Sequence, residues 1–165
     1  MSAYAGLASV VLAAESAAIH RQWLKTRQQA YGRQVLRRLS RGLLISGMDY
    51  FDCLRIRAAV LESFLADHMK DADAIILPVT PDSAPTVTET TTGDEQHLEQ
   101  QFSRLSMWTR GINYLGLPAL AVPAGRGTAG LPLAVQFVGG PFGETHILAL
   151  GKRLQEWSDW HQRVA

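Results

Sequence analysis

Residues 119–139 read ALAVPAGRGTAGLPLAVQFVG, two apolar runs on either side of a glycine-rich loop. The loop, GRGTAG at 125–130, matches the G-x-G-x-x-G pattern of dinucleotide-binding proteins. In those proteins the loop opens a helix, whose N-terminus holds the pyrophosphate. Here Gly130 is followed by Leu131, Pro132 and an apolar, β-branched run that is typical of a strand. The glycines therefore predict a turn between two strands, where a positive φ costs little.

A third apolar run indicates that this pair of strands belongs to a small sheet. Residues 74–79 follow acidic residues and precede prolines, as expected for a short buried strand. We expect an α/β fold in which a small mixed β-sheet of about three strands is flanked by helices. The strands are predicted near 74–79, 119–124 and 132–139. Because helices would cover both faces of the sheet, all three strands should be almost entirely apolar.

The helices are predicted from the distribution of proline and from apolar spacing. All 7 prolines lie at Pro78 or beyond, so residues 1–73 are predicted to be mainly helical. The clearest helix spans 48–70, where apolar residues spaced by three and four predict one buried stripe: Phe51, Leu54, Ala58, Leu61 and Leu65. Residues 74–142 should form strands and loops, and 143–161 a C-terminal helix, all within a single domain over 1–165.

The segment 81–101, PDSAPTVTETTTGDEQHLEQQ, is different in composition from the rest of the chain. It contains almost no large apolar side chain, and no Lys or Arg occurs between Asp71 and Ser103. Such a segment cannot bury enough apolar surface to pack by itself. We therefore expect a surface excursion or a partly disordered segment.

Composition excludes several classes of protein. The net charge of +1 over 165 residues gives no overall attraction to nucleic acid or membranes. The single cysteine, Cys53, cannot form an intrachain disulfide, and no signal-like or membrane-spanning run is present. These features predict a cytoplasmic protein that does not bind a membrane. The histidines are scattered without metal-ligand spacing, so we expect neither a metal nor another cofactor.

The segment 109–155 resembles the C-terminal part of the amidase signature enzymes. That family has an Asn-x-x-Gly-x-Pro motif, a strand, Val-Pro-x-Gly, a variable loop, Gly-Leu-Pro, a strand with Gln, and an aromatic residue and Glu before the last helix. The matching positions here are Asn113, Gly116, Pro118, Val122, Pro123, Gly125, Gly130, Leu131, Pro132, Gln136, Phe142 and Glu144. The segments 31–57 and 73–85 fit as well, so the resemblance covers about Glu15 to Trp157. Asn113, Gln136 and Arg57 are interpreted as buried structural residues that hold loops by hydrogen bonds.

The resemblance implies hydrolysis of carboxamide C–N bonds by a Ser-Ser-Lys mechanism. Those three residues lie in the N-terminal portion of the family's longer enzymes, and this chain has no Gly/Ser-rich loop. Its lysines, Lys25, Lys70 and Lys152, all lie on predicted helices. Because a serine hydroxyl needs an adjacent base, we expect no catalytic residue here and an inactive chain when it is alone. A small amide substrate would bind only where the N-terminal catalytic portion is supplied.

Ser106 and Trp108 are the candidate substrate-binding residues. In the family members that act on tRNA-linked Glu or Asp, the matching positions read Asp-Ile-Phe-Thr, and the Asp contacts the substrate. This chain has SMWT, so Ser106 replaces that Asp and Trp108 the Phe. A carboxylate that would pair with a substrate ammonium is missing. The resemblance therefore favours a general or aryl/alkyl amidase.

Two other functions stay open at this point. The chain is alternatively a non-catalytic interaction or regulatory module that has kept the amidase fold. A lower-ranked alternative is nucleic-acid binding through the basic segment between Arg21 and Arg41, which contains no acid; a solvated or packed helical face explains that segment better. In the parent fold these strands belong to a larger sheet, so we also expect an exposed sheet edge and a homo-oligomer.

Overall fold

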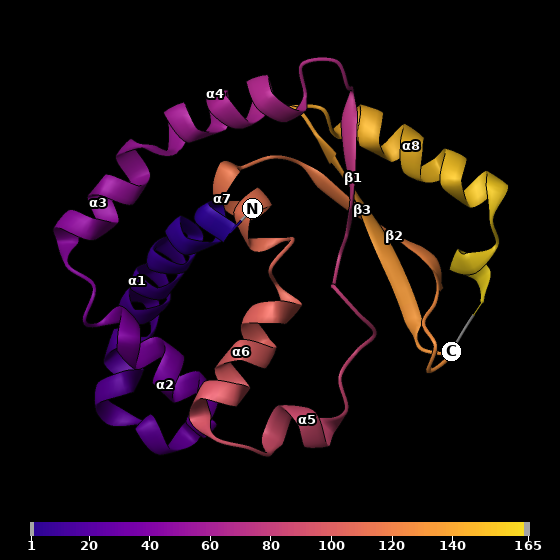
Figure 1. Ribbon diagram of the computed structural model, residues 1–165. Helices are drawn as coiled ribbons and strands as arrows, with labels where there is room; N and C mark the ends of the chain where they lie inside the picture. Colours follow the sequence, from indigo (N-terminus) through magenta and orange to yellow (C-terminus); the bar gives the residue numbers. More distant parts are fainter. Residues whose placement is uncertain (1, 164–165) are drawn as a thin grey trace.

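The computed structural model describes residues 2–163, which form a three-stranded sheet and a set of helices (Figure 1). Figure 1 shows α1 to α4 on one side of the molecule and the sheet with α8 on the other, while α5 and α6 complete a ring. The elements are α1 (Ser2–Thr26), η1 (Gln28–Ala30), α2 (Arg33–Gly42), α3 (Gly47–Arg55), α4 (Arg57–His68), β1 (Ala74–Pro78), α5 (Val87–Thr91), α6 (Glu95–Leu105), α7 (Arg110–Leu115), β2 (Ala119–Arg126), β3 (Pro132–Gly139), α8 (Glu144–Trp157) and η2 (Trp160–Gln162). No helix in this described part is long and apolar enough to cross a membrane.

The three predicted strands and the α/β class are confirmed, but the sheet is antiparallel rather than mixed. The strand order is β1-β3-β2, and β3 pairs antiparallel with both neighbours. The short connection between β2 and β3 reverses the chain direction, which enforces an antiparallel pair. β1 then adds to the other edge of β3, with Ile75 opposite Val138.

The glycine-rich loop is the predicted turn. Gly130 has a φ of 75°, in the left-handed region that favours glycine. The amide of Gly127 donates to the carbonyl of Leu131, and the amide of Gly130 donates to the carbonyl of Gly127, both at 2.9 Å. No helix begins at this loop, since Pro132 is already the first residue of β3. The dinucleotide interpretation is therefore excluded by the backbone.

Only the central strand is covered on both faces, so the prediction of three fully covered strands is wrong for the two outer ones. On one face Val138 packs with Ile75 and helices α4 and α7. On the other face Phe137 and Val122 pack against α8. This leaves Ile76 of β1 61% exposed, because α8 covers β2 and β3 but not β1. Ala121 of β2, which lies opposite Gln136 on the other face of the sheet, is exposed as well.

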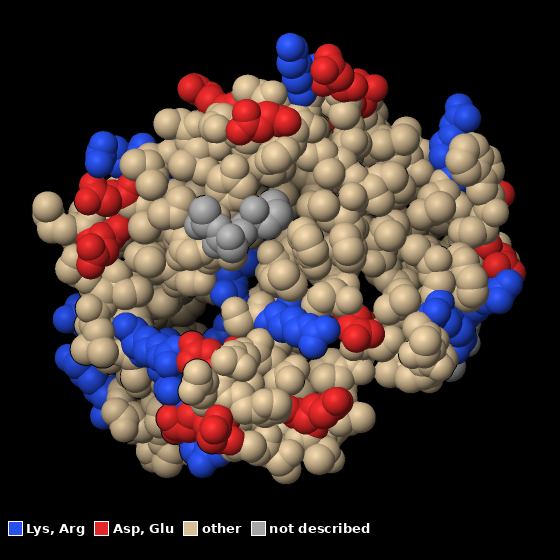
Figure 2. Space-filling model, in the orientation of Figure 1, with Lys and Arg blue, Asp and Glu red and all other residues tan. Residues whose placement is uncertain are grey.

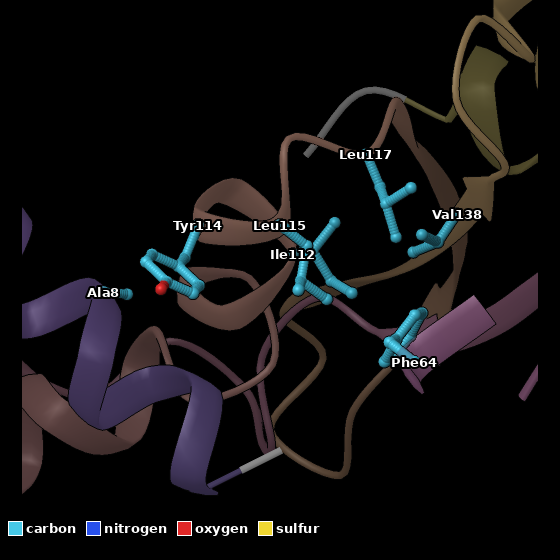
Figure 3. Close-up of a cluster of buried hydrophobic side chains, with 7 residues drawn as sticks. All are labelled: Ala8, Phe64, Ile112, Tyr114, Leu115, Leu117 and Val138. Atoms are coloured by element: carbon cyan, nitrogen blue, oxygen red, sulfur yellow. The ribbon is translucent and has the colours of Figure 1, made fainter. Parts of the chain in front are cut away.

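The main core lies where the helical half meets the sheet (Figure 3). Its buried members come from α1, α4, α7, the second residue after α7, and β3: Ala8, Phe64, Ile112, Tyr114, Leu115, Leu117 and Val138. The short helix α7 supplies three of the labelled side chains and lies between α1 and the sheet. Burying these apolar side chains joins the two halves into one packed unit.

The predicted single helix over 48–70 is two helices that meet at Ile56. Ser46 caps the first of them, since its Oγ accepts from the Asp49 amide at 3.0 Å. The buried residues are Cys53 and Phe64, whereas Phe51 of the predicted stripe is 69% exposed.

The segment 81–101 is also more ordered than its composition suggested, because it carries two effective helix caps. Thr86 and Glu89 form a capping box at the start of α5. Asp94 caps α6 by accepting from the His97 amide at 2.8 Å. α6 then buries Leu98 against the helical half. The excursion is therefore helical, and it forms one wall of a cavity.

Candidate substrate-binding cavity

A cavity of about 400 Å³ lies between α1, α2 and α6. This volume falls within the range of about 300–1,000 Å³ that is usual for small-molecule sites. Its apolar lining comes from residues such as Leu12, Leu39 and Leu98. Figure 2 shows positive and negative side chains gathered around hollows in the lower part of the molecule, where α2 and α6 lie in Figure 1.

The charged lining is dominated by arginine. Arg33, Arg37, Arg38 and Arg41 come from α2, and Arg110 is the first residue of α7. Only Glu95 and Glu99, both on α6, oppose these charges within the lining. The lining therefore carries more positive than negative charge, and the cavity would attract an anionic group.

Two of the arginines are paired with the glutamates of α6. Arg37 Nη1 lies 2.6 Å from Glu95 Oε2. Arg41 binds Glu99 with both of its terminal nitrogens, and Nη2 lies 2.6 Å from Oε2. The hydrogen bond from Arg41 lowers the pKa of the Glu99 carboxyl and the same bond raises the pKa of the Arg41 guanidinium.

Arg110 is held by two hydroxyl groups instead of a carboxylate. Its Nη1 donates to Ser9 Oγ at 3.0 Å, and its Nη2 donates to Ser106 Oγ at 2.5 Å. Burial lowers the pKa of the Arg110 guanidinium, and the positive charge of Arg38 nearby lowers it further. Among residues 2–163, neither Arg110 nor Arg38 forms an ion pair. Arg110 is thus positioned without an anionic partner in the described chain, while Arg38 lies close enough to Glu99 to help lower the pKa of its carboxyl.

An unused hydrogen-bond donor lines the same cavity. Gln34 Nε2 is buried and has no hydrogen-bond partner in the described part of the chain. A buried amide without a partner costs free energy, so an acceptor supplied from outside would be stabilising. Together with Arg38 and Arg110, this amide can bind a carboxylate or a similar oxyanion.

The structure brings one of the two predicted substrate-binding residues to this cavity. Ser106 contacts the cavity through its hydrogen bond with the lining residue Arg110. Trp108 does not line the cavity, and its carbonyl instead accepts from Gln136 Nε2 at 3.3 Å. Contact of Ser106 and Trp108 with a substrate stays a prediction.

The residues of the expected structural motif lie around the sheet. Gln136 is buried and links β3 to the ends of two other segments, since its Nε2 also donates to the Pro78 carbonyl at 3.0 Å. Gly116 ends α7 with a φ of 73°, and an added Cβ there would clash with Arg57 Nη2. Asn113 departs from the expectation because its side chain is exposed.

The remaining motif positions shape the connections of the sheet. The Pro118 carbonyl accepts from the Gly139 amide at 3.0 Å, which joins the start of β2 to the end of β3. Gly125 lies at the register shift of β2, Gly130 at the turn, and Pro132 at the start of β3. Their positions are compatible with a structural role, which stays a prediction.

Arg38, Arg110 and Ser9 were missed by the sequence analysis as site residues. The four-residue spacing of Arg33, Arg37 and Arg41 was a usable signal, since it matches that of Glu95 and Glu99. The convergence of Ser9 and Arg110, by contrast, joins residues that are 101 positions apart. No sequence spacing reveals such a contact. Within the described residues, no group of His, Cys, Asp and Glu has the arrangement of a metal site.

Comparisons with known proteins agree with the fold and its motifs. The model of the Amidase family matches residues 1–148. A glutamyl-tRNA(Gln) amidotransferase subunit of Neisseria gonorrhoeae (strain NCCP11945) is 33% identical over 165 residues, which cover 98% of this chain and 33% of the relative. The protein of the same name from Bordetella petrii (strain ATCC BAA-461 / DSM 12804 / CCUG 43448) is 31% identical, over 92% of this chain and 30% of its own length.

Solved structures give the same result. A structure described as "Crystal structure of amidase" matches 93% of this chain and 35% of its own, with a TM-score of 0.79 and 29% identity. A structure described as "An unexpected vestigial protein complex reveals the evolutionary origins of an s-triazine catabolic enzyme. Inhibitor bound complex." matches 94% of this chain and 34% of its own, with a TM-score of 0.77 and 26% identity. The chain spans about a third of the length of the curated relatives that it matches. The chain belongs to the amidase signature family.

Proposed function

We propose that this chain is the C-terminal portion of an amidase signature hydrolase, and that the intact enzyme cleaves the C–N bond of carboxamides. The Ser-Ser-Lys residues of the reaction would come from the remaining part of the family's length. In support, the lysines that the structure describes lie in or just after helices, and all three are exposed: Lys25, Lys70 and Lys152. None of them lines the cavity. The chain by itself would therefore be inactive.

Within that enzyme, this chain would bind the substrate. The observation that carries the proposal is the guanidinium of Arg110, which is fixed between Ser9 and Ser106 beside Arg38 and has no carboxylate partner in the described chain. An arginine in this state binds a carboxylate strongly, through charge-assisted hydrogen bonds. We therefore assign an acid-bearing amide as the substrate class.

The hydroxyl of Ser106 further limits the class of amide that we propose as the substrate. A hydroxyl that accepts from Arg110 supplies no negative charge for a substrate ammonium. This supports a general amidase, as the resemblance implied, although the curated relatives carry the name of a tRNA-dependent amidotransferase. An amide with an acid group and no ammonium group suits the cavity best. A cytoplasmic location fits such a small-molecule hydrolase, and this too is part of the proposal.

Self-association also belongs to this proposal. β1 and β2 are the outer strands of the sheet, and each offers one unpaired edge within the described residues. Ile76 of β1 adds an exposed apolar side chain beside one of those edges. Edges of this kind pair readily with another strand. A second copy of the chain is the partner that we propose for them.

The direct test is hydrolysis of a panel of simple amides by two proteins, the natural full-length protein and the 165-residue chain. Ammonia release should be seen with the full-length protein and should be absent with the chain alone. A full-length protein that releases no ammonia from any amide of the panel would favour the non-catalytic module. Salt-sensitive binding of a random oligonucleotide would instead favour the nucleic-acid alternative.

A further inference from the structure

Two glutamates on α6 form ion pairs with two arginines on α2 that have the same spacing along their helix. Arg37 and Arg41 are four residues apart on one helix, and Glu95 and Glu99 are four apart on the other. Arg37 meets Glu95 at 2.6 Å, and Arg41 meets Glu99 through two hydrogen bonds. All four residues line the cavity of α1, α2 and α6. The pairs thus determine how much positive charge the cavity offers to a ligand.

These pairs contribute little to the stability of the fold. Their side chains are between 37% and 61% exposed. Ion pairs with that exposure stabilise a protein by only about 0–1 kcal/mol each. α6 is fixed in addition by the buried side chain of Leu98 and by the Asp94 cap. Replacing both glutamates would therefore leave the helix in place while changing the charge beside the cavity.

We propose that Glu95 and Glu99 are specificity-determining residues that restrict the binding of ligands with two acid groups more than that of ligands with one. They occupy Arg37 and Arg41, which leaves Arg33, Arg38 and Arg110 of the lining for the ligand. This inference rests on the proposed function in one respect: the ligand of the cavity is taken to be the acid group of an amide substrate.

The restriction follows from the charge dependence of electrostatic energy. Each glutamate carboxylate repels an anion in the cavity, and the repulsion of a dianion is twice that of a monoanion at the same place. Removing both carboxylates also frees Arg37 and Arg41 to bind a second acid group. Neutral glutamines at 95 and 99 should therefore improve the binding of a dianion much more than that of a monoanion.

The test compares propionate with succinate, a monoanion and a dianion of similar size, as ligands of the purified full-length protein. Dissociation constants are measured by NMR titration at fixed ionic strength, for the wild type and for Glu95→Gln/Glu99→Gln. The matched control is Asp52→Asn/Asp159→Asn, which also removes two acids from surface ion pairs, with Arg55 and Arg163, outside this cavity. Circular dichroism confirms that each variant is folded.

In Glu95→Gln/Glu99→Gln the affinity for succinate relative to propionate should rise by about tenfold or more. The control should keep the wild-type ratio. An unchanged ratio in Glu95→Gln/Glu99→Gln would overturn the inference.

The outcomes separate this inference from the proposed function. If the ratio shifts as expected while no amide is hydrolysed, the proposed function fails and the inference stands. If acid-bearing amides are hydrolysed and the ratio does not move, the inference alone fails. If neither anion binds to any variant, the inference fails together with the acid-binding role, while hydrolysis of neutral amides would still support an amidase.

Discussion

Gln136, on the central strand, donates a hydrogen bond from Nε2 to the main-chain oxygen of Pro78 at the end of β1, at 3.0 Å. The same nitrogen reaches the Trp108 carbonyl at 3.3 Å. One buried amide thereby joins β3, β1 and the segment that leads from α6 to α7. Because α6 and α7 carry cavity residues, this link connects the sheet to the position of the proposed site.

Replacing Gln136 by leucine should destabilise the protein by about 1–3 kcal/mol, because the Pro78 and Trp108 carbonyls lose their donor. The measurement is the free energy of unfolding in urea. Asn113→Leu is a suitable control, since the Asn113 side chain is exposed and should change that free energy by about 0.5 kcal/mol or less. Equal effects of the two substitutions would contradict a structural role for Gln136.

Two helical glycines should respond to alanine in opposite directions. At Gly42 an added Cβ would clash with the Ala13 carbonyl oxygen, where α2 crosses α1, whereas at Gly6 nothing lies within 4 Å. Gly42→Ala should therefore cost about 1–3 kcal/mol or more through overpacking. Gly6→Ala should stabilise the protein by about 0.5–1 kcal/mol, since alanine favours the helix. Thermal unfolding of both variants tests the packing of α1 on α2.

The Arg41–Glu99 pair predicts a small loss of stability in acid. The folded pKa of Glu99 lies below its ordinary value of 4.5, so the ionised pair stabilises the fold above that pH. That contribution is lost as the pH falls through the folded pKa. Melting temperatures measured between about pH 3 and 6 should fall less steeply for Glu99→Gln than for the wild type. Parallel curves would contradict the ion pair.

The exposed strand edges predict self-association. At low micromolar concentration, sedimentation equilibrium should give a mass above the 18.1 kDa of a single chain. Ile76→Lys places a charge beside the edge of β1 and should shift the equilibrium toward the monomer. A wild type that sediments as a clean monomer of 18.1 kDa would contradict this prediction.

The sheet was predictable because its signals are local. Gly130 and Pro132 stand close to one another in the chain and together require a turn and then a strand. The break at Ile56 was not predictable in the same way, since the apolar spacing continues through it. The helices of 81–101 depend on the caps Thr86 and Asp94, which were present in the sequence but were outweighed by its polar composition.

The cavity was less predictable than the fold. Ser106 was identified through the family motif, and it does contact a cavity residue. Arg38 lay within a basic segment that was interpreted as a solvated or packed helical face. Its role in the cavity could not be predicted, because the charge of a helix does not specify which element it packs against. The contact of Arg110 with Ser9 depends on the packing of α7 on α1, which only the folded chain determines.

Binding of the substrate's acid group in the arginine-lined cavity can be tested by measuring kcat/KM of the full-length protein on two amides of equal size. One amide carries a carboxylate and the other is neutral. Arg38→Gln is compared with the wild type on both. We expect kcat/KM of the variant to fall by about tenfold or more on the acid-bearing amide, mainly through a higher KM, and to change little on the neutral amide. Equal losses on both amides, or no loss on either, would contradict the assignment of the arginine cavity as the site that binds the substrate's acid group.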